Sequence, residues 1–398
     1  MALATTRSNH PGEATGPGGS GTGVLRTIGL LSFFDRFSTA PLLVLAVRDL
    51  HVPMATAVQL VTVYALSCAL GQPVWGVVSD RIGRKAVLIA ALAGMIAGSG
   101  ASVLAPTFTG LLVARTVTGL FVGALFPTAL TILGDRYVGT ERSRQISDLQ
   151  TFTALGTTGA TLLAGTIAIA LGWRLVFALA GIAAIVLVVL AARLADPAAP
   201  VAVRAFRQSF TRWPLALYGV GVLEGGLLLG MFTYVLPALE RDGVSVSLAG
   251  VLASAYGVGI VVGAVTSKRI AHRIDRTTSI GTGSALLVAA FLVASLHHTP
   301  AGLTVTAALL GLCNSLLHAS LQGLATELTP ASRATTVSFF VCSVFVGSSL
   351  ATALTAAQTT HGYGTVFGEA AGAGVLMAAA AVAVSRGWSR RAGTTPRP

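Results

Sequence analysis

The chain has 398 residues, of which 54% are hydrophobic and 10% are charged. An ordinary soluble domain carries about 25% charged residues, so this composition excludes one and predicts an all-α integral membrane protein. The net charge of +12 does not indicate a nucleic-acid partner, because the basic residues lie in alternate loops and not on one patch. The three cysteines lie singly in apolar segments, and their spacing predicts neither a metal site nor a disulfide framework.

Residues 1–23 are rich in Gly, Ser, Thr and Pro and lack the continuous apolar stretch of a signal peptide. We expect a disordered cytoplasmic tail there. Twelve apolar segments follow, each close to the length of about 20 residues that crosses a bilayer. These predicted transmembrane helices are 24–47, 56–78, 86–105, 108–134, 147–172, 174–195, 214–239, 247–267, 278–297, 300–325, 334–357 and 364–385. Residues 386–398 are predicted to form a basic cytoplasmic tail.

The distribution of Lys and Arg predicts the orientation in the membrane. If the N-terminus is cytoplasmic, most basic residues fall in cytoplasmic loops, and the outer loops carry only Arg48, Arg174 and Arg241. This bias places both termini inside. We therefore expect a multi-pass protein of the plasma or inner cell membrane, surrounded by lipid bilayer and monomeric.

An internal repeat divides the chain in two. The longest internal polar segment, residues 196–213, is predicted to be a cytoplasmic linker between six-helix halves at 24–195 and 214–385. With an offset of 192 residues, Tyr64 matches Tyr256, Gly119 matches Gly311, and DRIGR at 80–84 matches HRIDR at 272–276. Two pseudo-symmetric halves are typical of transporters that hold their substrate near the midplane.

The loop after the second span, GVVSDRIGRK, concentrates charge in a chain that has little. It resembles the first-loop motif of the major facilitator superfamily through Gly76, Asp80, Arg81, Gly83, Arg84 and Lys85. Gly76 lets a neighbouring helix approach closely, and Gly83 permits a turn with positive φ. The resemblance implies a cytoplasmic latch that stabilises the outward-open state. The alternative is that these charges only set the topology.

The fourth span also resembles this family, whereas the fifth departs from it. Arg115, followed by Gly119 and Gly123, is similar to the family's intramembrane arginine motif. In the fifth span, antiporters of the family carry Gly-Pro where this chain has Ala160-Thr161. In the second half, His272 stands at the position of Asp80, which implies a weaker latch there.

Ionisable residues inside predicted spans are functional candidates, because placing them in hydrocarbon is costly. Asp35 and Arg36 lie half-way along the first span, Arg115 in the fourth and Glu224 in the seventh, and all four are candidates for proton coupling. Adjacent helix positions are about 100° apart, so Asp35 and Arg36 cannot face the same neighbour. Two alternatives remain open: a structural ion pair of Asp35 with Arg115, and a hydrogen-bonded carboxylic acid at Glu224.

Polar residues in the tenth span form a stripe. Asn314, His318 and Gln322 are spaced by four and share one helix face. Helices at this place in the family line the central cavity, so the resemblance implies substrate contact; hydrogen bonding between helices is the alternative. Tyr64 and Gln72 are weaker cavity candidates.

These features favour a secondary transporter that exports a small organic solute, such as a drug-like metabolite or a sugar, in exchange for protons. The alternative is a proton-coupled uptake symporter for an organic anion or metabolite. No H-E-x-x-H, G-x-S-x-G or phosphate-binding loop occurs in the sequence, so we expect neither an enzyme nor a cofactor.

Overall fold

The computed structural model describes residues 19–57, 59–194, 203–270, 273–355, 357–360 and 362–394, and helices dominate it. The first half contains α1 (Gly19–Leu50), α2 (Met54–Ala57), α3 (Gln59–Ile82), α4 (Arg84–Leu104), α5 (Phe108–Arg136), α6 (Gly139–Gly159), the π-helix η1 (Ala160–Ala164), α7 (Gly165–Leu171) and α8 (Trp173–Ala192). The second half opens with η2 (Val203–Phe210), α9 (Arg212–Gly225), the π-helix η3 (Gly226–Gly230), η4 (Met231–Tyr234), α10 (Val235–Arg241), α11 (Val246–Ala253) and α12 (Ala255–Ile270). It continues with α13 (Arg276–Leu296), α14 (Pro300–Cys313), the π-helix η5 (Asn314–His318), α15 (Ala319–Leu328), η6 (Pro330–Ser332), α16 (Arg333–Thr355), η7 (Gln358–Thr360) and α17 (Tyr363–Thr394).

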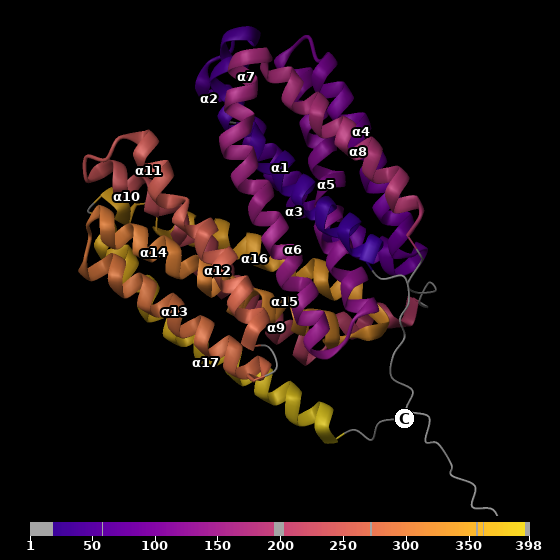
Figure 1. Ribbon diagram of the computed structural model, residues 1–398, viewed down its shortest axis with the longest axis vertical. Coiled ribbons are helices and arrows are strands. Elements are labelled where there is room, and N and C mark those ends of the chain that lie inside the picture. Colours follow the sequence, from indigo (N-terminus) through magenta and orange to yellow (C-terminus); the bar gives the residue numbers. More distant parts are fainter. Residues whose placement is uncertain are drawn as a thin grey trace, which may run out of the picture.

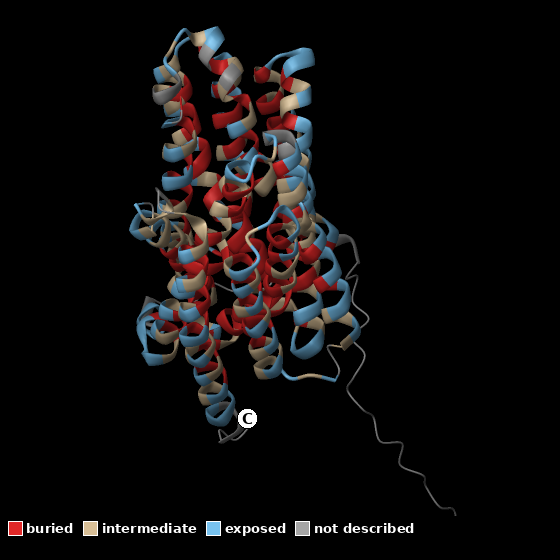
Figure 2. Cartoon of the chain, turned by 90° about the vertical axis from the view of Figure 1, so that its left-hand side faces the viewer, coloured by how far each residue is buried: buried red, intermediate tan, exposed pale blue. Residues whose placement is uncertain are grey.

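These elements confirm the predicted all-α membrane fold. Eleven helical stretches in the described residues are long and apolar enough to cross a membrane. The 32-residue α1, which carries Asp35 and Arg36 near its middle, is a further long helix and completes the twelve. Large apolar side chains such as Leu104, Ile169 and Leu296 are exposed on the outside, where lipid covers them, while buried residues follow the inside of each bundle (Figure 2).

The two halves meet at one end of the molecule (Figure 1). There α16 packs against α3, and α6 packs against α12 and α15. We call this the motif end; it carries Ile82, Arg136 and Arg333, where α3 and α5 end and α16 begins. The opposite end carries α2 and α7 in one half and α10 and α11 in the other, and these lie apart in Figure 1.

Each half keeps its own ion pairs at that opposite end. Asp49 pairs with Arg174 in the first half, and a hydrogen bond from Arg174 lowers the pKa of the Asp49 carboxyl. Asp242 lies 3.9 Å from His298 in the second half. Ion pairs that join the halves instead gather at the motif end, where Arg142 meets Glu327, Asp148 meets Lys268, and Asp135 meets Arg333.

Glycine lets helix backbones touch where the repeat predicts equivalence. A Cβ on Gly119 would lie 2.7 Å from the carbonyl oxygen of Tyr64, and one on Gly311 would lie 2.1 Å from that of Tyr256. These are the residues that match at an offset of 192, so both halves use the same close helix crossing.

The ends of several elements differ from the predicted segments. α1 begins at Gly19, inside the predicted tail 1–23, and residues 1–18 lie outside the described residues. The predicted linker 196–213 includes the 3₁₀ helix η2, and residues 195–202 again lie outside. α17 continues to Thr394, nine residues past the predicted span end at 385, and residues 395–398 are not described. The exact domain boundaries stay a prediction.

The closest helix crossing gives a test of this packing. A Cβ on Gly225 would lie 1.9 Å from the carbonyl oxygen of Val344 on α16, whereas one on Gly219 would meet nothing within 4 Å. We expect Gly225→Ala to destabilise the protein by about 1–3 kcal/mol, because the backbones must separate. Gly219→Ala on the same helix should leave stability unchanged or raise it slightly. Thermal unfolding of both purified variants in detergent checks this, and equal melting temperatures would contradict the packing.

Candidate functional site

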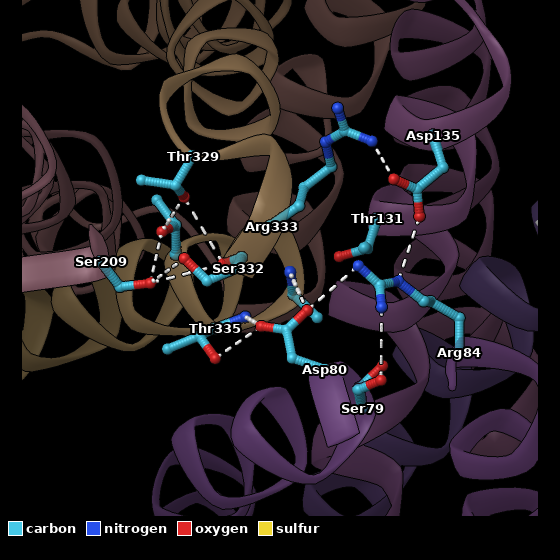
Figure 3. A network of polar contacts seen from close by, with 12 residues as sticks. Ser79, Asp80, Arg84, Thr131, Asp135, Ser209, Thr329, Ser332, Arg333 and Thr335 are labelled. Carbon is cyan, nitrogen blue, oxygen red and sulfur yellow. Dashed lines mark hydrogen bonds and ion pairs between the residues drawn. The ribbon is translucent and has the colours of Figure 1, made fainter. Parts of the chain in front are cut away.

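The first-loop motif contacts the other half of the molecule directly. Asp80, near the end of α3, accepts hydrogen bonds from the backbone N–H groups of Ala334 (3.2 Å) and Thr335 (2.8 Å), and from the Thr335 hydroxyl (2.7 Å) (Figure 3). These are the first N–H groups of α16, which have no partner within their own helix. A carboxylate is stabilised there by both the N–H groups and the helix dipole.

Arg84 and Asp135 extend this contact (Figure 3). The buried Arg84 guanidinium lies 3.0 Å from Asp80 and 3.1 Å from Asp135, and Asp135 also pairs with Arg333 of the other half. One carboxylate therefore serves an arginine of each half. Arg81 and Lys85 of the motif form no ion pair with another described residue.

Neither motif glycine could carry a side chain without strain or a clash. Gly83 has a φ of 95°, the left-handed region in which a side chain would be strained. A Cβ on Gly76 would lie 2.6 Å from the Cβ of Ser338 on α16. Gly76 therefore lets α3 and α16 approach across the interface of the halves.

A second charged cluster mirrors the first. Glu327 accepts from Arg276 in its own half (2.5 Å) and from Arg142 in the other half (2.8 Å). Arg276 and Glu327 follow Arg84 and Asp135 by 192 residues. The repeat offset could therefore have identified this pair in the sequence, although reasoning from the loop motif alone missed it. His272, the counterpart of Asp80, lies outside the described residues.

Asp35 and Arg115 form a sealed pair, and neither side chain is exposed. Two guanidinium nitrogens of Arg115 donate to the two carboxylate oxygens at 3.1 Å, and the Tyr64 hydroxyl donates to the same carboxylate at 2.5 Å. The rings of Tyr64 and Phe177 cover the guanidinium at 4.4 and 4.5 Å. This geometry fits the structural ion pair that the sequence offered beside a role for Asp35 in proton coupling.

Arg36 points away from Asp35. Its guanidinium lies 5.4 Å from the ring of Phe33 and 4.6 Å from the ring of Phe345, which belongs to α16 in the other half. Its Nε atom is buried without a hydrogen-bond partner. Gln72, on α3, is also buried, and its Oε1 atom has no partner.

Glu224 and the polar stripe form one hydrogen-bonded chain. His318 Nδ1 lies 2.7 Å from Glu224 Oε1, and His318 Nε2 lies 2.9 Å from Gln322 Nε2. Gln150, on α6 of the other half, donates to Gln322 Oε1 at 2.9 Å. Glu224 is fully buried, and its Oε2 atom has no partner. Asn314 instead donates to the Tyr256 hydroxyl at 2.9 Å.

The donors and acceptors in this series of hydrogen bonds fix the direction in which each bond runs. The amide nitrogen of Gln322 can only donate, so His318 Nε2 accepts. The ring proton therefore sits on Nδ1 and is donated to Glu224. The arrangement combines an acid, a titratable ring and a hydrogen bond between the halves. Among the described residues, no group of three His, Cys, Asp or Glu side chains could hold a metal ion.

Two repeated helical halves that close on each other at one end, with polar groups between them, define a membrane transporter of small solutes and not an enzyme. The chain belongs to the Major Facilitator Superfamily, whose family model matches residues 27–239 and 220–397. This result confirms the resemblance found in the sequence.

Characterised relatives span different cargoes. The chain is 30% identical over 165 residues to the niacin transporter NiaP of Acinetobacter baylyi, covering 41% of this chain and 38% of NiaP. It is 31% identical over 121 residues to the multi-drug resistance efflux pump PmrA of Streptococcus pneumoniae, covering 30% of each. The matches thus span about a third of the length of these relatives.

A solved structure shows the same fold over nearly the whole chain. FucP, the fucose:proton symporter of E. coli, has a TM-score of 0.75 in its outward conformation at 13% identity, covering 92% of this chain and 97% of FucP.

The Asp80 contact predicts a conformational effect of Asp80→Asn. Asparagine would turn one N–H group toward backbone donors, with a loss of about 1.5–3 kcal/mol for a charge-assisted hydrogen bond. The populations should shift about tenfold or more toward separation at the motif end. Spin labels at the exposed residues Arg144 and Arg269 would show longer distances. Asp275→Asn, which caps α13 within one half, is the control and should change nothing; unchanged distances in Asp80→Asn would contradict the latch.

Proposed function

We propose that this chain is a proton-coupled secondary transporter that exports a small organic solute by antiport across a cell membrane, with both termini cytoplasmic. The single observation that carries the coupling is the buried Glu224–His318 pair, which has one free carboxylate oxygen and a hydrogen-bonded connection to the other half. The efflux pump PmrA among the relatives supports the direction.

Taking up a proton would reverse the polarity of the Glu224–Gln150 chain. In the geometry described above, His318 Nε2 accepts from the Gln322 amide. A protonated ring would direct an N–H group at the same amide nitrogen, so two donors would face each other. Gln322 would have to turn its amide, and its nitrogen would then face the nitrogen of Gln150. The hydrogen bond between the halves would be lost unless Gln150 turned as well.

This polarity change gives the proton a differential effect on the two conformations, which is what coupling requires. The closed arrangement at the motif end binds the unprotonated pair better. If the motif end is cytoplasmic, as the Lys and Arg distribution predicts, the protein faces outward here, and protonation favours opening inward.

Asp35 and Arg115 have a supporting part in this proposal. Each satisfies the other's charge in a fully buried site, and removing one would leave the other unpaired at a cost of about 3–5 kcal/mol. We therefore assign the proton to Glu224 and His318, and the positioning of α1 against α5 to the Asp35–Arg115 pair.

A second candidate function is uptake of an organic anion by proton symport. The guanidinium of Arg36, which has no carboxylate partner among the described residues, favours it, as does the similarity to a niacin transporter. Right-side-out vesicles distinguish the two. Symport accumulates solute when the outside is acidic, whereas antiport accumulates it when the inside is acidic.

Glu224→Gln tests the proton route. The neutral amide can neither take up a proton nor balance the charge of a protonated His318 ring, so we expect accumulation driven by a pH gradient to fall more than tenfold, while exchange of solute without a gradient persists. The measurement is gradient-driven transport of nicotinate, ethidium and fucose in vesicles, with a pH dye in the lumen.

The matched control is Glu240→Gln, an exposed glutamate at the outer end of the same span, which should behave like the unmodified protein. Full gradient-driven accumulation by Glu224→Gln would refute the assignment of the proton to the Glu224–His318 pair.

A further inference from the structure

Arg36 is a half-buried cation that has no carboxylate partner among the described residues, and its Nε atom is buried without a hydrogen-bond partner. It lies half-way along α1. Among the described residues, no carboxylate forms an ion pair or a hydrogen bond with it. An arginine at this depth is costly unless a partner neutralises it, and contacts with aromatic faces offset only part of that cost.

Neighbouring carboxylates are already committed. The carboxylate of Asp35 accepts from Arg115 and Tyr64, and it lies on a different side of α1 from the Arg36 side chain. The carboxylate of Glu224 is held by His318 in the other half. No carboxylate of the described residues is therefore paired with Arg36, which leaves its guanidinium available to an anionic ligand.

The surroundings of Arg36 define the shape of this molecule. The guanidinium lies between the ring of Phe33 on its own helix and the ring of Phe345 on α16, so it sits at the interface of the two halves. Phe126 packs edge-on against Phe33, with the ring centroids 5.4 Å apart. A guanidinium binds a carboxylate through two parallel hydrogen bonds, and phenyl rings provide apolar contact for a flat body.

We propose that Arg36 binds the carboxylate of the transported solute, and that this solute is a small aromatic or otherwise flat organic anion. The proposal rests on the proposed function only in that the chain transports a solute, and it holds for export and import alike. A solute bound here would touch both halves, which is where a cargo must sit to influence their relative movement.

Equilibrium binding tests the ligand class without any gradient, so its outcome is independent of the proton route through Glu224. Purified protein is titrated with benzoate and nicotinate, and with the uncharged isosteres benzamide and nicotinamide, at constant ionic strength. We expect the carboxylates to bind at least tenfold more tightly than the amides. Arg36→Gln should abolish this preference. Arg36→Lys keeps the charge but cannot form the two parallel hydrogen bonds of a guanidinium, so it should retain part of the preference.

Thermal unfolding of the ligand-free variants gives a second readout. Arg36→Gln should raise the melting temperature, because an uncompensated charge is removed, whereas Arg115→Gln should lower it by unpairing Asp35. Arg48→Gln, an exposed position at the end of the same helix, is the control for charge loss and should have no effect. Binding of amides as tight as that of carboxylates, absence of carboxylate binding, or a lower melting temperature for Arg36→Gln would overturn the proposal.

Discussion

The interaction on which this structure depends is the sharing of one carboxylate between two arginines from different halves. Asp135 binds Arg84 of its own half and Arg333 of the other, and Glu327 does the same with Arg276 and Arg142. The intra-half bond holds the carboxylate in place, and the second bond closes the molecule. Because both clusters lie at a helix end, opening would expose their charges to water instead of lipid. Such pairs can therefore separate without leaving an unpaired charge in hydrocarbon, which a moving interface requires.

The ion pairs of Asp135 and Glu327 differ from the charged groups at Asp35, Glu224 and Arg36 in their depth in the membrane. Asp35 and Arg115 have no exposed surface, so their separation would leave two charges without solvent, and we propose that this pair stays closed while the protein moves. Glu224 has similar burial but a titratable partner, His318, whose side chain is 13% exposed. The acidic and basic charges are therefore paired at Asp35 and Arg115. At the proposed proton site the pairing depends on the titratable His318. At the proposed anion site, Arg36 has no acidic partner among the described residues.

The sequence predicted the elements whose information is local or repeated. Apolar length predicted the spans, and the offset of 192 matched Gly119 with Gly311, where the structure repeats the same close helix crossing. Pairing between halves was not predictable from the loop motif, because Arg333 looks like any other basic residue that follows the topology rule. The stripe of the tenth span was only partly anticipated. His318 and Gln322 do touch, but the π-helix η5 widens the turn before them, and Asn314 contacts Tyr256.

The proposed proton chain and one of the closing ion pairs lie on the same two helices. α6 carries Arg142 and Gln150, and α15 carries Gln322 and Glu327. Arg142 pairs with Glu327 near the motif end, while Gln150 and Gln322 form their hydrogen bond deeper in the membrane. A helix transmits displacement along its axis with little bending. A change at the Gln150–Gln322 pair would therefore act on the Arg142–Glu327 pair through α6 and α15. In the proposed mechanism, a proton at His318 therefore needs no long pathway to influence closure, because it would act through this one contact between α6 and α15.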